Sequence, residues 1–290
     1  MDPKSIVILA FQLSIVCTVL GFGLHGSRND LLYLWRRPGL LVRSIVSVML
    51  IMPAVALAME AWFDFRPTTE LALVALALSP IPPLLPTKSD RAGGEHSYIV
   101  SLLLTLSLVS IVAVPVSAAL MSVLFERQFE VSVGAVAKVV LVMAVLPLIV
   151  GVVIRRRMPR FADHIAPMVS RIAKILLPLA IVVLLAAAWR GIWDAIGDGT
   201  ILAIVMFVVI GMVVGHLLGR PERGNSVGLA LATSCRHPAI ALTIASANFP
   251  NQHFAGTILL YVLVSALIGV PYVMYMHRCE VPAPTQTPKA

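Results

Sequence analysis

Apolar positions occur along this chain in long continuous runs, and polar positions gather in the short segments between them. An α-helix of roughly 20 apolar residues spans the hydrocarbon core of a bilayer. Runs that are apolar all round therefore predict transmembrane helices rather than surface helices with one apolar face. The uninterrupted runs are 6–26, 39–62, 95–124, 132–154, 167–189, 198–219 and 254–277.

Two further apolar segments, 69–94 and 223–250, are interrupted by residues that a continuous helix disfavours. Proline removes a backbone donor and clashes with the preceding turn, so each interruption predicts a broken helix. Broken backbone is tolerated at membrane depth only where protein or a water-filled cavity surrounds it. The breaking residues are Pro80, Pro82, Pro83 and Pro86 in the first segment and Pro238 in the second.

The distribution of basic residues predicts that both interrupted segments cross the membrane. Lys and Arg concentrate in cytoplasmic loops, so the number of crossings between two cytoplasmic clusters is even. The uninterrupted runs alone do not give an even number of crossings between every pair of neighbouring clusters, so both interrupted segments must also cross. This predicts nine spans in an inner or plasma membrane, with the N-terminus outside and the C-terminus cytoplasmic. The clusters are Arg28/Arg36/Arg37, Arg155/Arg156/Arg157/Arg160, Arg220/Arg223 and Arg278/Lys289.

Composition agrees with a protein that lies within a bilayer. Apolar residues make up 59% of the 290 residues, charged residues make up 12%, and the mean hydropathy is +0.95. A soluble domain carries about 25% charged residues, so a soluble enzyme, a nucleic-acid-binding domain and a disordered regulator are excluded. The net charge of +8 reflects basic cytoplasmic loops. The three cysteines lack metal-ligand spacing, so we expect no disulfide framework, metal or cofactor.

The two interrupted spans are the third and the eighth, so they cross the membrane in opposite directions. This spacing predicts inverted five-helix repeats in which the first repeat lacks its first helix. Residues 1–124 would form the incomplete repeat with four spans, residues 125–277 the second repeat with five, and residues 278–290 a disordered cytoplasmic tail. Interrupted helices at equivalent places in two halves indicate the central binding site of a transporter.

Polar and ionisable residues at the interruptions are the candidate substrate- or ion-binding residues. Ionisable groups within a membrane are costly unless paired or hydrated, and they commonly mark a substrate or ion pathway. Free main-chain groups at half-helix ends also bind ions. An alternative for Lys88 is that its side chain extends to water at the cytoplasmic interface. The candidates are Thr87, Lys88, Ser89, Thr233, Ser234, Arg236 and His237.

Several short strings follow one another along nearly the whole chain: Leu20-Gly21-Phe22-Gly23-Leu24, Ile51-Met52-Pro53-Ala54, Ser79-Pro80, Gly228-Leu229-Ala230-Leu231-Ala232 and Ala245-Ser246-Ala247-Asn248-Phe249. In this order they resemble the bile acid:sodium symporter family. The resemblance implies an all-α fold with two crossed discontinuous helices, in which one of ten helices is absent here. It also implies a panel domain of spans one, five and six and a core domain of the other spans. Organic anions would be transported with sodium, and the substrate would bind in the crevice between the two domains.

The chain departs from that family where the resemblance implies sodium ligands. The first interruption has 81–88 where the family shows a glycine pair and then Ser-Asn, and the second has Ala232 and Arg236 where the family shows Glu and Gln. Fixed positive charges at Lys88 and Arg236 would repel a bound sodium ion. We therefore expect sodium-independent transport, or coupling to protons through Lys88 or His237.

The pattern as a whole predicts a secondary transporter that moves a small organic anion, a carboxylate or bile-acid-like molecule, by alternating access. One alternative is a transport-inactive membrane receptor or partner subunit, which would also lack sodium ligands. Another is an intramembrane enzyme, although Ser234, Cys235 and His237 lack a third orienting group. The expected partners are the anion and the lipid bilayer, with no nucleic acid, and we do not expect an enzyme.

Overall fold

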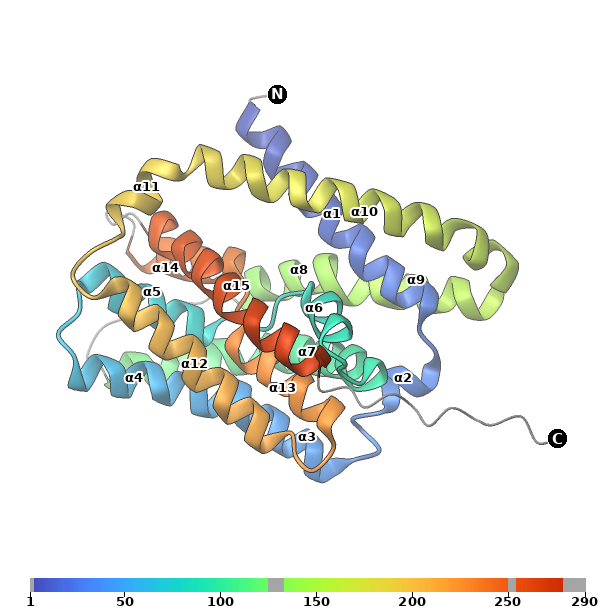
Figure 1. The fold of residues 1–290 in the computed structure, drawn as a ribbon, viewed down its shortest axis with the longest axis horizontal. Helices are drawn as coiled ribbons and strands as arrows, with labels where there is room; N and C mark the ends of the chain where they lie inside the picture. The colour runs from blue at the N-terminus through green and yellow to red at the C-terminus, as the bar shows by residue number, and fades with distance from the viewer. Residues whose placement is uncertain (1–2, 125–132, 250–253, 279–290) are drawn as a thin grey trace.

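The computed structural model describes residues 3–124, 133–249 and 254–278, and every regular element within those ranges is a helix (Figure 1). The first half contains α1 (Pro3–His25), α2 (Arg28–Leu32), α3 (Pro38–Ile45), the π-helix η1 (Val46–Ile51), α4 (Met52–Trp62), α5 (Pro67–Leu78), α6 (Leu85–Arg91) and α7 (His96–Leu124). The second half contains α8 (Val133–Val140), the π-helix η2 (Leu141–Val145), α9 (Leu146–Arg157), α10 (Pro159–Ala187), α11 (Trp189–Asp194), α12 (Thr200–Leu218), α13 (Arg223–Ser234), α14 (Pro238–Asn248) and α15 (Ala255–Arg278).

Seven of the described helical segments are long and apolar enough to cross a membrane by length and composition, and α13 with most of α14 counts as one of them. Two shorter apolar helices, Leu9–His25 within α1 and Pro67–Leu78, accompany these segments. Apolar helices of this kind satisfy all their backbone groups internally, as a bilayer requires. The chain is therefore a polytopic membrane protein, and the part of it that the structure describes is all-helical.

The helices start and end close to the predicted runs, with three differences. Helix α10 begins at Pro159 rather than at 167, because proline suits a first helical turn and the charged turns that follow lower the hydropathy. The short helices α2 and α11 lie in segments expected to be loops. Helix α15 includes Arg278, the first residue of the predicted tail, and the rest of that tail lies outside the described residues.

Helices α1, α9 and α10 pack together, and we call them the three-helix group. Their close contact depends on glycine. A Cβ atom added to Gly23 would lie 2.4 Å from the carbonyl oxygen of Leu148, and one added to Gly151 would lie 2.6 Å from that of Leu20. Backbones therefore approach directly at this point, which is how small residues hold membrane helices together. In Figure 1, α1 crosses α10 on the upper side of the molecule.

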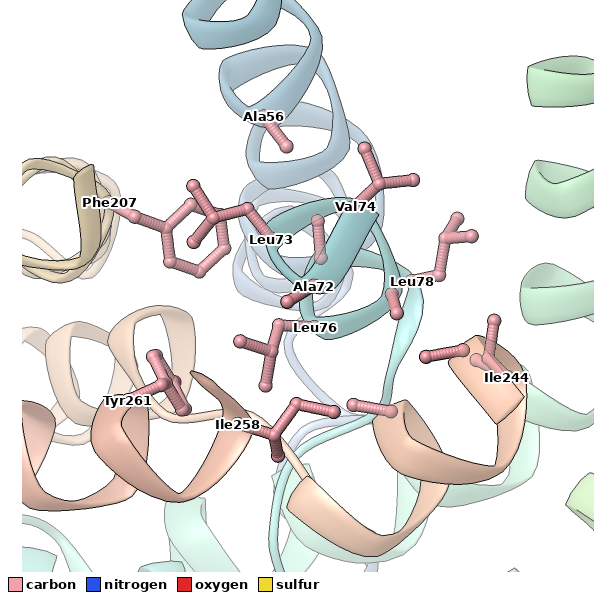
Figure 2. Close-up of a cluster of buried hydrophobic side chains, with 14 of the residues drawn as sticks. Ala56, Ala72, Leu73, Val74, Leu76, Leu78, Phe207, Ile244, Ile258 and Tyr261 are labelled. Carbon is pink, nitrogen blue, oxygen red and sulfur yellow. The ribbon is translucent and has the colours of Figure 1, made fainter. Parts of the chain in front are cut away.

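Helix α5 lies at the centre of the remaining helices. Every residue from Leu71 to Leu78 is buried, as expected for a helix that is apolar on all sides. Figure 2 shows its side chains surrounded by Phe207 of α12, Ile244 of α14 and Tyr261 of α15. The half-helix that enters the first break is thus held on several sides.

Connections at the two ends of the molecule are tied by charged side chains. At one end the guanidinium of Arg66 donates to Asp198 over 3.0 Å, which joins the connections before α5 and before α12. At the other end, Arg37 pairs with Glu222 at 3.8 Å and Arg43 donates to the carbonyl of Arg220. The basic segments before α3 and before α13 therefore lie side by side.

Candidate functional site at the two helix breaks

The two helix breaks are in direct contact. The N–H of His237, in the break between α13 and α14, donates to the carbonyl oxygen of Pro80, in the break between α5 and α6, over 2.9 Å. Ser79 and Cys235 both have extended backbone where their helices end. Each break thus gives the other a hydrogen-bond partner that its own helix does not supply.

Prolines leave two carbonyl groups beside this contact without a helical partner. The carbonyl of Ser79 would bond to the N–H of residue 82 or 83 in a continuing helix, and both residues are proline. The carbonyl of Val48 lies in η1, where the partner is the N–H five residues later. That later residue is Pro53, which has no N–H.

The side chain of Arg236 bonds to both of these carbonyls. Its Nη1 donates to the Ser79 oxygen over 3.2 Å, and its Nη2 donates to the Val48 oxygen over 2.9 Å. The residue is only 2% exposed. Within the described residues, no acidic side chain lies within ion-pair distance of Arg236. The negative ends of the dipoles of α5 and α13, which terminate here, compensate part of the buried positive charge.

A third proline-freed carbonyl is satisfied by a tyrosine. Pro238 cannot donate to the carbonyl of Ser234, and the hydroxyl of Tyr261 on α15 donates to it over 2.7 Å. The hydroxyl of Ser234 instead donates to Leu231, and that of Thr233 shares a 2.7 Å hydrogen bond with Ser47 of η1. The candidates Ser234 and Thr233 therefore strengthen α13 and join it to η1.

Helix α6 brings one of its candidate residues to the second break. Lys88 is half-buried, and its Nζ lies 3.8 Å from the Sγ of Cys235, next to Arg236. Thr87 is half-buried on the same helix. Ser89 is fully buried against the turn that follows α6, where a Cβ on Gly94 would lie 2.0 Å from its Oγ. Lys88 is thus the α6 candidate that reaches the other break.

Buried polar atoms without a hydrogen-bond partner concentrate on the candidate residues. Within the part of the chain that the structure describes, these atoms are Nε of Arg236, Nδ1 and Nε2 of His237, Oγ of Ser89 and Oγ1 of Thr105. His237 is only 5% exposed, so bulk water does not reach most of its ring. A buried polar group left without a protein partner is costly, and such groups commonly mark a place that binds water, an ion or a ligand.

Sequence reasoning missed two residues that complete the site. Val48 and Tyr261 lie in apolar runs and have no feature of a ligand-binding motif. The sequence does contain a signal for Val48, because a proline inside a span deprives an earlier carbonyl of its hydrogen-bond donor. Tyr261 carries the weaker signal of a hydroxyl within an apolar run, and such a hydroxyl must find an acceptor when buried.

A pocket of about 610 Å³ lies away from the breaks, where α1 and α9 end. Its lining includes His25, Leu31, Val152, Arg155 and Arg156 and none of the candidate residues. Arg155 is engaged in an ion pair with Asp163. The pocket places this basic cluster beside the end of α1, and it is separate from the candidate site.

The chain combines apolar helices with two proline-broken segments in contact, and buried polar groups lie at that contact. These features define the architecture of a polytopic membrane transporter. The model of the Sodium Bile acid symporter family matches residues 12–195, from α1 to the end of α11, and the chain belongs to this family. The resemblance drawn from the sequence is thereby confirmed. The match includes the first break, and the second break lies beyond it. No curated protein matches the chain.

Proposed function

We propose that the protein is a secondary transporter that carries a small organic anion, with the substrate bound beside the two helix breaks. The observation that carries the proposal is the concentration of unpartnered buried nitrogens on Arg236 and His237. A carboxylate or sulfonate oxygen is an acceptor, and hydrogen bonds to a charged group are among the stronger ones. The positive charges of Arg236 and Lys88 favour an anion over a cation.

Alternating access follows from two helix groups that move relative to each other. In our proposal the three-helix group is the panel domain, and the helices around α5, α7 and α13 form the core domain. The nine spans are then two inverted repeats, residues 1–124 and 125–277, whose broken helices cross at the site. The close glycine contacts within the three-helix group support movement of that group as one body.

Transport in this proposal does not require sodium. Sodium is held by oxygen ligands, and the carbonyls of Ser79 and Val48 already accept hydrogen bonds from a fixed cation. Protons remain the alternative coupling ion, with Lys88 and His237 as candidate carriers. Substrate uptake into proteoliposomes with sodium replaced by choline, at several pH values, separates these possibilities.

The test begins with a ligand and ends with uptake. Thermal unfolding of the purified protein is measured against carboxylates, sulfonates and bile acids, because a ligand of the folded state raises the midpoint. The best ligand is then used for uptake, which we expect to persist in choline. His237→Ala should weaken binding about tenfold if one hydrogen bond to a charged ligand is lost. His164→Ala, on the exposed surface of α10, is the matched control.

Three results would each contradict a part of this proposal. A flat thermal response to every anion class, with no uptake of any of them, would contradict transport of organic anions. Uptake that disappears in choline at every pH would contradict sodium independence alone. Equal loss of binding in His237→Ala and His164→Ala would remove His237 from the site.

A further inference from the structure

We infer that the guanidinium of Arg236 fills a monovalent-cation site built into the contact between the two helix breaks. Removing the side chain would then create a site for a free cation, so that the variant binds an ion that the wild type does not need. As an explanation of sodium-independent transport, this inference rests on the proposed function. The cation site itself rests only on the arrangement of groups around Arg236.

The groups around the guanidinium are those that bind a cation. Its partners are two main-chain carbonyl oxygens, from the end of α5 and from η1. Rings of backbone carbonyls bind alkali ions elsewhere by replacing the hydration shell. Both oxygens are without helical partners because of prolines, so they are free to accept from a cation of any kind.

Two helix C-termini also direct negative partial charge toward this point. Helices α5 and α13 end here, at Leu78 and Ser234, with the negative ends of their dipoles. In the described part of the chain no carboxylate pairs with Arg236, so an ordinary ion pair does not explain the buried charge. The site stabilises a cation through oriented carbonyl groups.

Attachment to the chain explains why no free ion is needed. Arg236 begins the turn into α14, so its guanidinium is present at the carbonyls at a high effective concentration. The Nζ of Lys88 lies close to the neighbouring Cys235 and adds positive charge, which disfavours a second cation. A folded wild-type protein should therefore be indifferent to which monovalent cation the buffer contains.

The experiment measures thermal unfolding of the purified protein without any substrate. Wild type, Arg236→Ala and Arg236→Gln are compared in sodium, potassium and choline chloride of equal ionic strength, and with about 10 mM guanidinium, far below denaturing concentrations. We expect the wild type to show one midpoint in all four. Guanidinium, sodium or potassium should raise the midpoint of Arg236→Ala or Arg236→Gln by about 5 °C over choline.

The control is Arg43→Ala. The guanidinium of Arg43 also donates to main-chain carbonyls, those of Gly39 and Arg220, but it is half-exposed at the end of the molecule. Water can replace that side chain, so cation identity should not change the midpoint of the variant. Arg236→Lys keeps the charge and should also be indifferent to the added cation.

Folded Arg236→Ala or Arg236→Gln protein whose midpoint is the same in all four conditions would overturn the inference. If neither variant can be purified even with guanidinium present, the carbonyls do not accept a free cation and the inference is also wrong. The proposed function fails separately. A wild type that binds and transports no anion would contradict transport, while the cation dependence of the Arg236 variants would still support the cation site.

Discussion

At the scale of single residues, the candidate site is explained by prolines that lack an N–H group and by side chains that donate in place of that group. Pro53 frees the carbonyl of Val48, and Pro238 frees that of Ser234. A bare buried carbonyl costs free energy comparable to a lost hydrogen bond. Arg236 and Tyr261, from distant parts of the chain, remove that cost. The breaks are therefore stable only in the folded arrangement that brings these donors to them.

Tyr261 allows a direct test of this account. Tyr261→Phe removes the hydroxyl that donates to the Ser234 carbonyl and leaves the ring in place. The buried carbonyl then lacks a donor, so we expect a loss of about 1–3 kcal/mol in the free energy of unfolding. The measurement is the unfolding midpoint of the purified protein. Tyr275→Phe, on the same helix and 64% exposed, should change nothing. Equal midpoints for the two variants would contradict the role given to Tyr261.

At the scale of helices, the sequence predicts where each half-helix ends but not what completes it. The proline run from Pro80 to Pro86 and the single Pro238 mark both breaks, and the structure ends α5 and α13 at those places. Hydropathy also identifies the long spans, because continuous apolar runs depend only on local composition. The π-helix η1 has no comparable sequence pattern.

Partners across the breaks depend on contacts between distant segments. The bond from Arg236 to Val48 joins residues 188 positions apart, and no periodicity of the sequence encodes such a pair. The charge and prolines of the second break did point to Arg236 and His237 as unusual. Their arrangement, with two Nη atoms on carbonyls and three other nitrogens without partners, requires the packed helices.

At the scale of helices, glycine substitutions can test the direct packing of α1 on α9. Gly23→Ala would place a Cβ 2.4 Å from the Leu148 carbonyl and 2.9 Å from the Cα of Gly151, so the two helices must separate. Overpacking of this kind costs about 1–3 kcal/mol, measured as a lower unfolding midpoint. A Cβ on Gly269 of α15 would meet nothing within 4 Å. Gly269→Ala should therefore leave the midpoint unchanged or raise it, and a similar loss in both variants would contradict direct backbone packing.

For the whole molecule, the described residues of the basic clusters lie at one end. Arg37 pairs with Glu222, and Arg223 donates to the carbonyl of Met276 near the end of α15. The pocket formed by the end of α1 brings Arg155 and Arg156 to the same end. An even number of membrane crossings between neighbouring clusters requires this arrangement. Which side of the membrane that end faces is a prediction from the positive-inside rule.

Cysteine labelling tests the predicted orientation. Single cysteines are introduced at Asp64, exposed in the connection between α4 and α5, and at Arg157, exposed at the end of α9. The parent for both has its three native cysteines replaced, and retained thermal stability is its control. Figure 1 shows these two connections toward opposite ends of the long axis.

Because Lys and Arg in short loops are retained on the cytoplasmic side, the end that carries Arg155, Arg156 and Arg157 should face the cytoplasm. We therefore expect a membrane-impermeant thiol reagent to label Asp64→Cys on intact cells and to label Arg157→Cys only after permeabilisation. The reverse pattern would invert the orientation, and so place the N-terminus inside. Labelling of both cysteines on intact cells would contradict a membrane that separates the two ends.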